Sequence, residues 1–309
     1  MLSRIAQSLF WIGRYLERAD DTARILDVQT QVLVEDPGMD ERTSCEQLLE
    51  VMGVEQYEGV PNHRLILRML AHDPDSHNSI AYALNGCRES ARGARETLST
   101  EIWTAINTTW RGLGAARAMR PPAMFDWVRT RTAMISGIVD STMSRDEGWQ
   151  FLQLGRSIER VDMTARLLST AALASGPQVA WTTALRACGA YESFIRTYRG
   201  IEADRQAAEF LLLDRLFPRS IVWSLNEAEK ALNRLEVGGR RAGFGDEAQR
   251  LLGRARTELE YRPLADIVFD LPVEMERLQR SCAAASDAIT TRYFAVADGA
   301  QAWKGGVVL

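Results

Sequence analysis

A charged helical motif occurs twice in this chain of 309 residues. The segment GRYLERADDTARIL at 13–26 aligns without gaps with GRSIERVDMTARLL at 155–168, at an offset of 142. Nine of these 14 positions are identical. A second set of matches relates 73–85 to 214–226 at an offset of 141. Two matched segments in the same order at nearly one offset indicate that a whole half of the chain was duplicated.

The duplication predicts the architecture. Apolar residues recur mostly at helical spacing, and alternating strand patterns are scarce. We therefore predict an all-α fold, a helical bundle of two pseudo-symmetric repeats packed as one compact unit. The first repeat is expected at 1–143 and the second at 144–298. The glycine-rich segment 299–309 is expected to be a flexible tail.

Breaks in the helical pattern suggest where individual helices begin and end. Pro121 and Pro122, and the pair Gly176-Pro177, are expected to end helices, and Ser44 and Ser79 are expected to begin them as N-caps. The helices expected on this basis are 3–34, 44–53, 79–98, 101–117, 125–143, 145–174, 179–198, 203–213, 220–235, 246–261 and 273–297.

The composition excludes several classes of protein. The apolar fraction of 46% and the charged fraction of 25% are those of a globular protein. A net charge of -4 provides no general attraction to nucleic acid or to an anionic membrane. The chain opens without a signal-peptide pattern, and no stretch approaches the ~18 apolar residues of a membrane span. Its four cysteines lie far apart, as is typical of reduced thiols. We expect a cytoplasmic protein that binds neither nucleic acid nor membrane.

The charges of the repeated motif gather on one side of its helix. At about 100° per residue, six positions of the first copy, including Glu17 and Asp21, share an arc of about 120°. The spacing predicts ion pairs along the helix: Arg14 with Glu17, Glu17 with Arg24, and Asp20 with Arg24. The candidate site residues are Arg14, Glu17, Arg18, Asp20 and Arg24 in the first copy, and Arg156, Glu159, Arg160, Asp162 and Arg166 in the second.

These charges are kept between the two copies, whereas packing residues change. Tyr15, for example, is replaced by Ser157. An exposed ion pair contributes only ~0–1 kcal/mol, so charges that merely kept the helix soluble should have changed first. Their retention indicates that they are buried, paired or functional. One change breaks the symmetry, because Asp21 corresponds to Met163.

Two interpretations of the charged helices stay open. In the first, the helices meet near a pseudo-twofold axis and the Glu and Arg residues of one copy bridge the other, a pairing whose disruption costs ~3–5 kcal/mol. In the second, the helices line a polar pocket. Glu17 and Glu159 then serve as acid/base or amine-binding carboxylates, and the arginines hold a carboxylate or phosphate. Gly13 and Gly155 suit both, because glycine lets a backbone or a ligand approach closely.

Other signatures of catalysis or metal binding are missing from the sequence. No histidine has a Glu three residues before it, so the Glu-x-x-His pattern of di-iron bundles is absent. The loose spacing of His72 and His77 falls short of a zinc signature. The segment 112–120 lacks the Lys-Ser/Thr of a phosphate-binding loop, and the basic, glycine-rich segment 237–245 is interpreted as an interhelical loop. We therefore expect no metal and no cofactor.

The segments SLFWIGRYLERADDTARIL and LGRSIERVDMTARLL resemble the bacterial Alpha-E domain family, helical proteins named for a Glu-Arg motif. That motif falls here on Glu17-Arg18 and Glu159-Arg160. The segments LLLDRLFPRSIVWSLNEAEKALNRL and AITTRYF are also similar to the family, so the resemblance covers nearly the whole chain. It implies partners: a circularly permuted ATP-grasp protein and a transglutaminase-like peptidase, in systems that make or modify a peptide through ATP-dependent amide bonds.

Three hypotheses of function follow. The chain is an accessory or binding subunit of an ATP-grasp amidoligase system, and it holds the ligase or its peptide in a groove between the two halves. Alternatively, it is an enzyme of unknown type that uses Glu17 or Glu159 on an aminoacyl or acyl-phosphate peptide substrate. A third possibility is a purely structural scaffold. The lack of a recognisable nucleophile, metal set or phosphate loop favours the first hypothesis.

Overall fold

The computed structural model describes residues 1–35, 40–54, 56–173, 177–199, 204–236 and 243–295. These residues form α-helices and two short π-helical segments, with no strand among them, which confirms the predicted all-α class. The elements are α1 (Ser3–Glu35), α2 (Glu41–Val51), α3 (His63–Ile66), η1 (Leu67–His72), α4 (Ile80–Gly93), α5 (Thr100–Ala116), α6 (Pro121–Thr142), α7 (Glu147–Leu173), α8 (Pro177–Ala187), α9 (Tyr191–Thr197), α10 (Asp204–Leu213), α11 (Ile221–Leu235), α12 (Glu247–Tyr261), α13 (Leu264–Phe269), α14 (Leu271–Ile289) and η2 (Thr290–Phe294).

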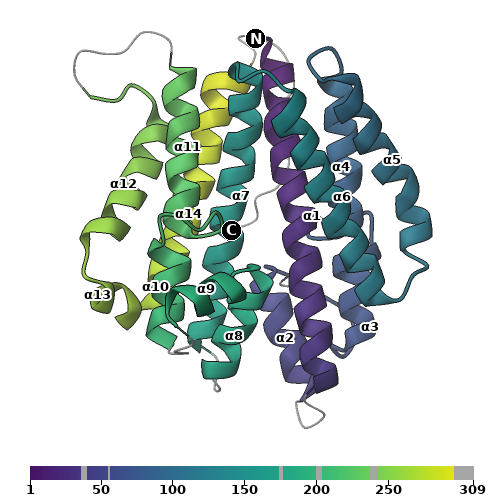
Figure 1. The fold of residues 1–309 in the computed structure, drawn as a ribbon, viewed down its shortest axis with the longest axis vertical. Helices are drawn as coiled ribbons and strands as arrows, with labels where there is room; N and C mark the ends of the chain where they lie inside the picture. Colours follow the sequence, from purple (N-terminus) through teal and green to yellow (C-terminus); the bar gives the residue numbers. More distant parts are fainter. Residues whose placement is uncertain (36–39, 55, 174–176, 200–203, 237–242, 296–309) are drawn as a thin grey trace.

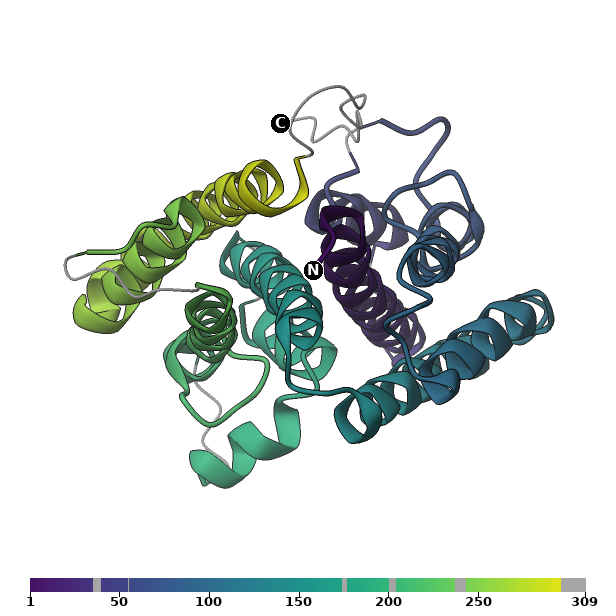
Figure 2. The ribbon, with the colours of Figure 1, turned by 90° about the horizontal axis from the view of Figure 1, so that it is seen from above.

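The two long helices that carry the repeated motif, α1 and α7, pack against each other in the middle of the molecule (Figure 1). Helices α4 and α6 pack on α1, with α5 outside them, and α11 and α14 pack on α7, with α12 outside them (Figure 2). Near one end the halves interlock, because α2 contacts α7 and α8 contacts α1. The motif helices therefore lie between the outer helices of the two halves.

A single cluster of buried apolar side chains runs through both halves. Leu9 and Ile12 of α1 are buried in it, and so are Leu152 and Ile158 of α7. The core is thus shared between α1 and α7, and the two halves pack as one compact unit, as predicted. Among the described helices, none has the length and apolar character needed to cross a membrane.

Matching turns lead into α4 and α11. The side chain of Ser79 caps α4 by accepting a hydrogen bond from the backbone N–H of Tyr82 (2.9 Å), which confirms the predicted cap. Ser220 caps α11 in the same way through Trp223 (3.1 Å), 141 residues later. This local geometry recurs at the offset found in the sequence. The common ancestry of the halves and their boundary stay predictions, and the tail at 299–309 lies outside the described residues.

Some expected helix boundaries are wrong. Pro121 and Pro122 begin α6 instead of ending a region, because proline suits the first turn of a helix, where no N–H is needed. The helix expected at 179–198 is two helices, interrupted at Gly189, whose φ of +61° is incompatible with a continuing helix. Helix α2 starts before Ser44, because the side chain of Asp40 caps it. Most of the expected loop at 237–245 lies outside the described residues.

Candidate functional site

Helices α1 and α7 cross in close backbone contact at the two motif glycines. A Cβ atom on Gly13 would overlap the carbonyl oxygen of Leu152, and one on Gly155 would overlap that of Phe10. Because backbone atoms cannot move aside as a flexible side chain can, only glycine permits this crossing. The Glu-Arg pair that follows each glycine by one turn then faces the opposite helix.

The two Glu-Arg pairs bind each other reciprocally. Arg18 donates from Nε to Oε1 of Glu159 (2.5 Å) and from Nη2 to Oε2 (3.1 Å). Arg160 donates from Nε to Oε1 of Glu17 (2.6 Å) and from Nη2 to Oε2 (2.7 Å). Both are bidentate guanidinium–carboxylate forks, the strongest form of ion pair in proteins. The glutamates are buried, with exposed fractions of 5% for Glu17 and 1% for Glu159. We call this set of four residues the ER clamp.

Each carboxylate of the ER clamp also binds a second arginine, but not an equivalent one. Arg14 donates from Nε to Glu159 (2.7 Å), whereas Arg219 contacts Glu17 (3.0 Å). Arg156 corresponds to Arg14 by sequence, yet it donates from Nη1 to the side chain of Gln153 (3.5 Å) and forms no ion pair with a described residue. Every oxygen of the two glutamates accepts at least one hydrogen bond from an arginine.

This pairing keeps both glutamates ionised. Burial alone would raise their pKa values, but the surrounding guanidinium groups outweigh it. Arg160 and Arg219 lower the pKa of Glu17 to about 2, and Arg18 and Arg14 lower that of Glu159 to about 2. The ER clamp is therefore a charged network inside the bundle, and the geometry favours the first interpretation, in which each copy bridges the other.

The predicted ion-pair ladder along each helix is only partly right. The pair of Asp20 with Arg24 is confirmed at 2.8 Å, and its counterpart, Asp162 with Arg166, lies at 2.9 Å. The pairs expected between Glu17 and the arginines of its own helix are wrong. The side chain of Glu17 points across to α7, where an arginine can reach both of its oxygens.

Arg219 is a central residue that the sequence reasoning missed. It lies in the turn before α11 and hydrogen-bonds to the carboxylates of Asp20 and Asp21. The second half holds Met163 in place of Asp21, and Asn78 of the first half aligns with Arg219. The acid Asp21 and the base Arg219 thus both lack a charged counterpart at the equivalent position of the other half. A comparison of the two repeats could have found this paired change, because both positions lie in the aligned segments.

Glu17, Asp20 and Asp21 can bring one oxygen each to within 4.8 Å of one another, a spacing that could suit a metal ion. Arg219 contacts all three carboxylates, so its guanidinium already supplies the positive charge that a cation would bring. The pKa of Asp21 is raised to about 7, because burial outweighs the opposing effect of Arg219, and the two neighbouring carboxylates add to the rise.

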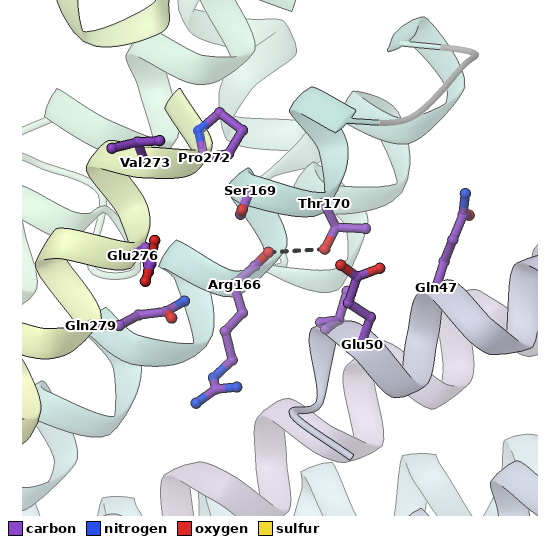
Figure 3. Close-up of a pocket in the computed structure, with 10 residues that line it drawn as sticks. Gln47, Glu50, Arg166, Ser169, Thr170, Pro272, Val273, Glu276 and Gln279 are labelled. Atoms are coloured by element: carbon purple, nitrogen blue, oxygen red, sulfur yellow. Dashed lines mark hydrogen bonds between the residues drawn. The ribbon is translucent and has the colours of Figure 1, made fainter. Parts of the chain in front are cut away.

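A second feature, open to the surface, lies at the end where the halves interlock. A groove of about 400 Å³ is formed by α2 of the first half and by α7 and α14 of the second. Glu50 projects from α2, Arg166 and Thr170 from α7, and Glu276 from α14 (Figure 3). Of the ten predicted site residues, Arg166 alone lines this groove, and the others lie in or beside the ER clamp. Their proposed catalytic and ligand-binding roles stay predictions.

Residues 1–294 match the family described as a predicted alpha-helical domain with a conserved ER motif. The chain belongs to the Alpha-E family. The Glu-Arg pairs of the repeated helical motif, Glu17-Arg18 and Glu159-Arg160, are the residues that form the ER clamp. In this Alpha-E protein, each of these two motif pairs thus provides the binding partner of the other.

Relatives of this Alpha-E protein include the uncharacterized protein Mb2597 of Mycobacterium bovis and the uncharacterized proteins MT2643 and Rv2567 of Mycobacterium tuberculosis. Each is 26% identical to it over 263 residues, which cover 75% of this chain. The match covers 30% of each relative, so the chain corresponds to less than a third of their length. No solved structure gives a significant match.

Proposed function

We propose that this Alpha-E protein is a non-catalytic binding subunit of an ATP-grasp amidoligase system that makes or modifies a peptide. It binds the peptide in the groove between α2, α7 and α14 and presents it to the ATP-grasp protein. The partners come from the family resemblance, which implies a circularly permuted ATP-grasp protein and a transglutaminase-like peptidase. The observation that supports a binding role over a catalytic one is the closed geometry of the ER clamp.

An acid/base catalyst must exchange a proton with its substrate, and its pKa should lie near the working pH. Glu17 and Glu159 are buried, all their oxygens are engaged, and their pKa values are about 2. The enzyme hypothesis would therefore require the ER clamp to open. The four cysteines offer no alternative nucleophile, because each is buried and burial raises the pKa of its thiol.

The groove, in contrast, is accessible and is built from both halves. A ligand in it contacts α2 on one side and α7 and α14 on the other. The packing of α2 onto α7 of the opposite half creates this groove. The ER clamp then holds α1 and α7, and with them the walls of the groove, in a fixed relative position.

Co-purification tests the proposal. The tagged chain, the proposed ATP-grasp partner, the peptide and ATP are expected to form a complex that survives gel filtration. The substitution Glu50→Lys in the groove should weaken this complex. Glu96→Lys, at an exposed position between α4 and α5, provides a control with the same charge change. If the chain and the ATP-grasp protein do not associate when peptide and ATP are both present, the proposal is contradicted. A folded Glu159→Gln variant that binds the partner but blocks modification would favour the enzyme hypothesis.

A further inference from the structure

The groove between α2, α7 and α14 has the size of a binding site for a side chain or a chain end. Its volume of about 400 Å³ falls within the range of small-ligand sites, about 300–1,000 Å³. It contains three ionisable lining residues, Glu50, Arg166 and Glu276. The charge state of these three residues therefore decides which ligand the groove attracts.

The lining arginine already has an acidic partner within the protein. Arg166 donates from Nε to Asp162 (2.9 Å). The turn that follows α2 lies against the other end of its guanidinium, where a Cβ atom on Gly53 would come within 2.6 Å of Nη1. Gly53 has a φ of +68°, a conformation that glycine adopts without strain. The positive charge of Arg166 is thus already paired with the carboxylate of Asp162.

The two lining glutamates remain available. Glu50 is exposed and forms no ion pair with a described residue. Glu276 pairs through Oε1 with Arg280 (2.5 Å), a contact at the surface where both side chains are more than half exposed. Figure 3 shows Glu50 and Glu276 on opposite sides of the groove, with the Arg166 side chain between them. The three lining charges therefore sum to minus one, from two acids and one base.

The neutral part of the lining suits a cation with an apolar stem. The hydroxyl of Thr170 donates to the carbonyl oxygen of Arg166 (3.2 Å), which leaves its own oxygen as an acceptor. Val51 and Val273 add apolar surface, and Val273 is 44% exposed. Long amines bury their methylene groups on such surface and keep their charge among acceptors.

We infer that this groove is a binding site for an ammonium group of a peptide, held between the carboxylates of Glu50 and Glu276. The inference rests on the proposed function for the presence of a peptide. Its basis is the pair of facing carboxylates around an arginine whose charge is already used. The ammonium group can belong to a lysine side chain or to a free N-terminus, and both present the same donor to the two acids.

Four short synthetic peptides test this inference on the full chain. The first is acetyl-Gly-Lys-Gly-amide, which carries only a lysine ammonium, and the second is Gly-norleucine-Gly-amide, which carries only an N-terminal one. Acetyl-Gly-norleucine-Gly-amide carries no charge, and acetyl-Gly-Glu-Gly-amide is an anion. Binding is followed by NMR titration of the isotope-labelled protein at low salt. We expect one or both ammonium peptides to bind more tightly than the other two, and their ratio identifies the source of the amine.

Substitutions of the two lining glutamates, Glu50 and Glu276, test the same inference. Glu50→Gln should weaken binding of the ammonium peptide about tenfold, the effect of losing one charged hydrogen bond. The double variant Glu50→Gln, Glu276→Gln should weaken it further, and Glu96→Gln should not change it. Equal binding of the uncharged or anionic peptide, unchanged affinity of the double variant, or no binding of any peptide would overturn the inference. The assay contains only this chain, so a failed association with the ATP-grasp protein leaves its result unaffected.

Discussion

Arg18 of α1 and Glu159 of α7 are joined by two parallel hydrogen bonds, and Arg160 and Glu17 repeat this fork with the roles of the helices exchanged. The Glu-Arg pair is therefore self-complementary. Each copy provides an acid for the base of the other copy and a base for its acid. A change in either member would leave an uncompensated charge in a buried interface, which is a physical reason for the two residues to be kept together.

Loss of Glu159 should destabilise the protein more than loss of Glu17. Glu159→Gln leaves both Arg14 and Arg18 without a carboxylate partner, and breaking a buried pair of this kind costs ~3–5 kcal/mol. Glu17→Gln costs less, because Arg219 keeps its contacts with two aspartates. Urea unfolding at pH 7 measures both free energies. Equal losses, or a larger loss for Glu17→Gln, would contradict the asymmetry of the network.

Stability should fall in acid because of the ER clamp. The pKa of Glu159 is lowered from 4.5 to about 2 in the folded protein. Its stabilising contribution is then fully present above about pH 5 and is lost as the pH falls toward 2, with a total on the order of 3 kcal/mol. Unfolding free energies measured from pH 7 to pH 2 should therefore decline more steeply for the unmodified protein than for Glu159→Gln. Parallel curves would show that this carboxyl group does not titrate as described.

The glycine crossing predicts a sharp contrast between chemically identical substitutions. Gly13→Ala would place a methyl group against the backbone of α7, and such overpacking costs ~1–3 kcal/mol or more. The matched control is Gly137→Ala in α6, where an added Cβ has no atom within 4 Å. This control should raise stability by about 0.5–1 kcal/mol, because alanine favours the helix. Thermal unfolding compares the two variants. If Gly13→Ala does not lower stability, α1 and α7 are not in close backbone contact at this glycine.

Arg219 and Asp21 should show strong coupling. Arg219→Asn removes the base that neutralises a group of three carboxylates and should be clearly destabilising. Adding Asp21→Met copies the opposite half, which holds Asn78 and Met163, and should restore part of the loss. A double-mutant cycle is expected to give an interaction energy of ~1–3 kcal/mol. An additive result would mean that the two residues do not act as a pair.

The sequence was sufficient for the features that depend on local spacing. The helical periodicity predicted the all-α fold, and the capping role of Ser79 followed from its position before an apolar run. The pair of Asp20 with Arg24 was also predictable, because residues four apart on a helix are neighbours wherever the helix lies. The repeat showed that charge is kept on one arc of two helices, which is why these charges were expected to be buried, paired or functional.

The partners of those charges depended on tertiary structure. Arg14 lies three residues from Glu17 on the same helix, so spacing alone made it as good a partner as any residue of the other half. Packing of α1 on α7 at the glycine crossing brought Arg160 within bidentate reach of Glu17, and a fork across the interface outweighs a single contact along a helix. Arg219 and the groove follow from the same cause: side chains far apart in sequence meet only when the helices that carry them have packed.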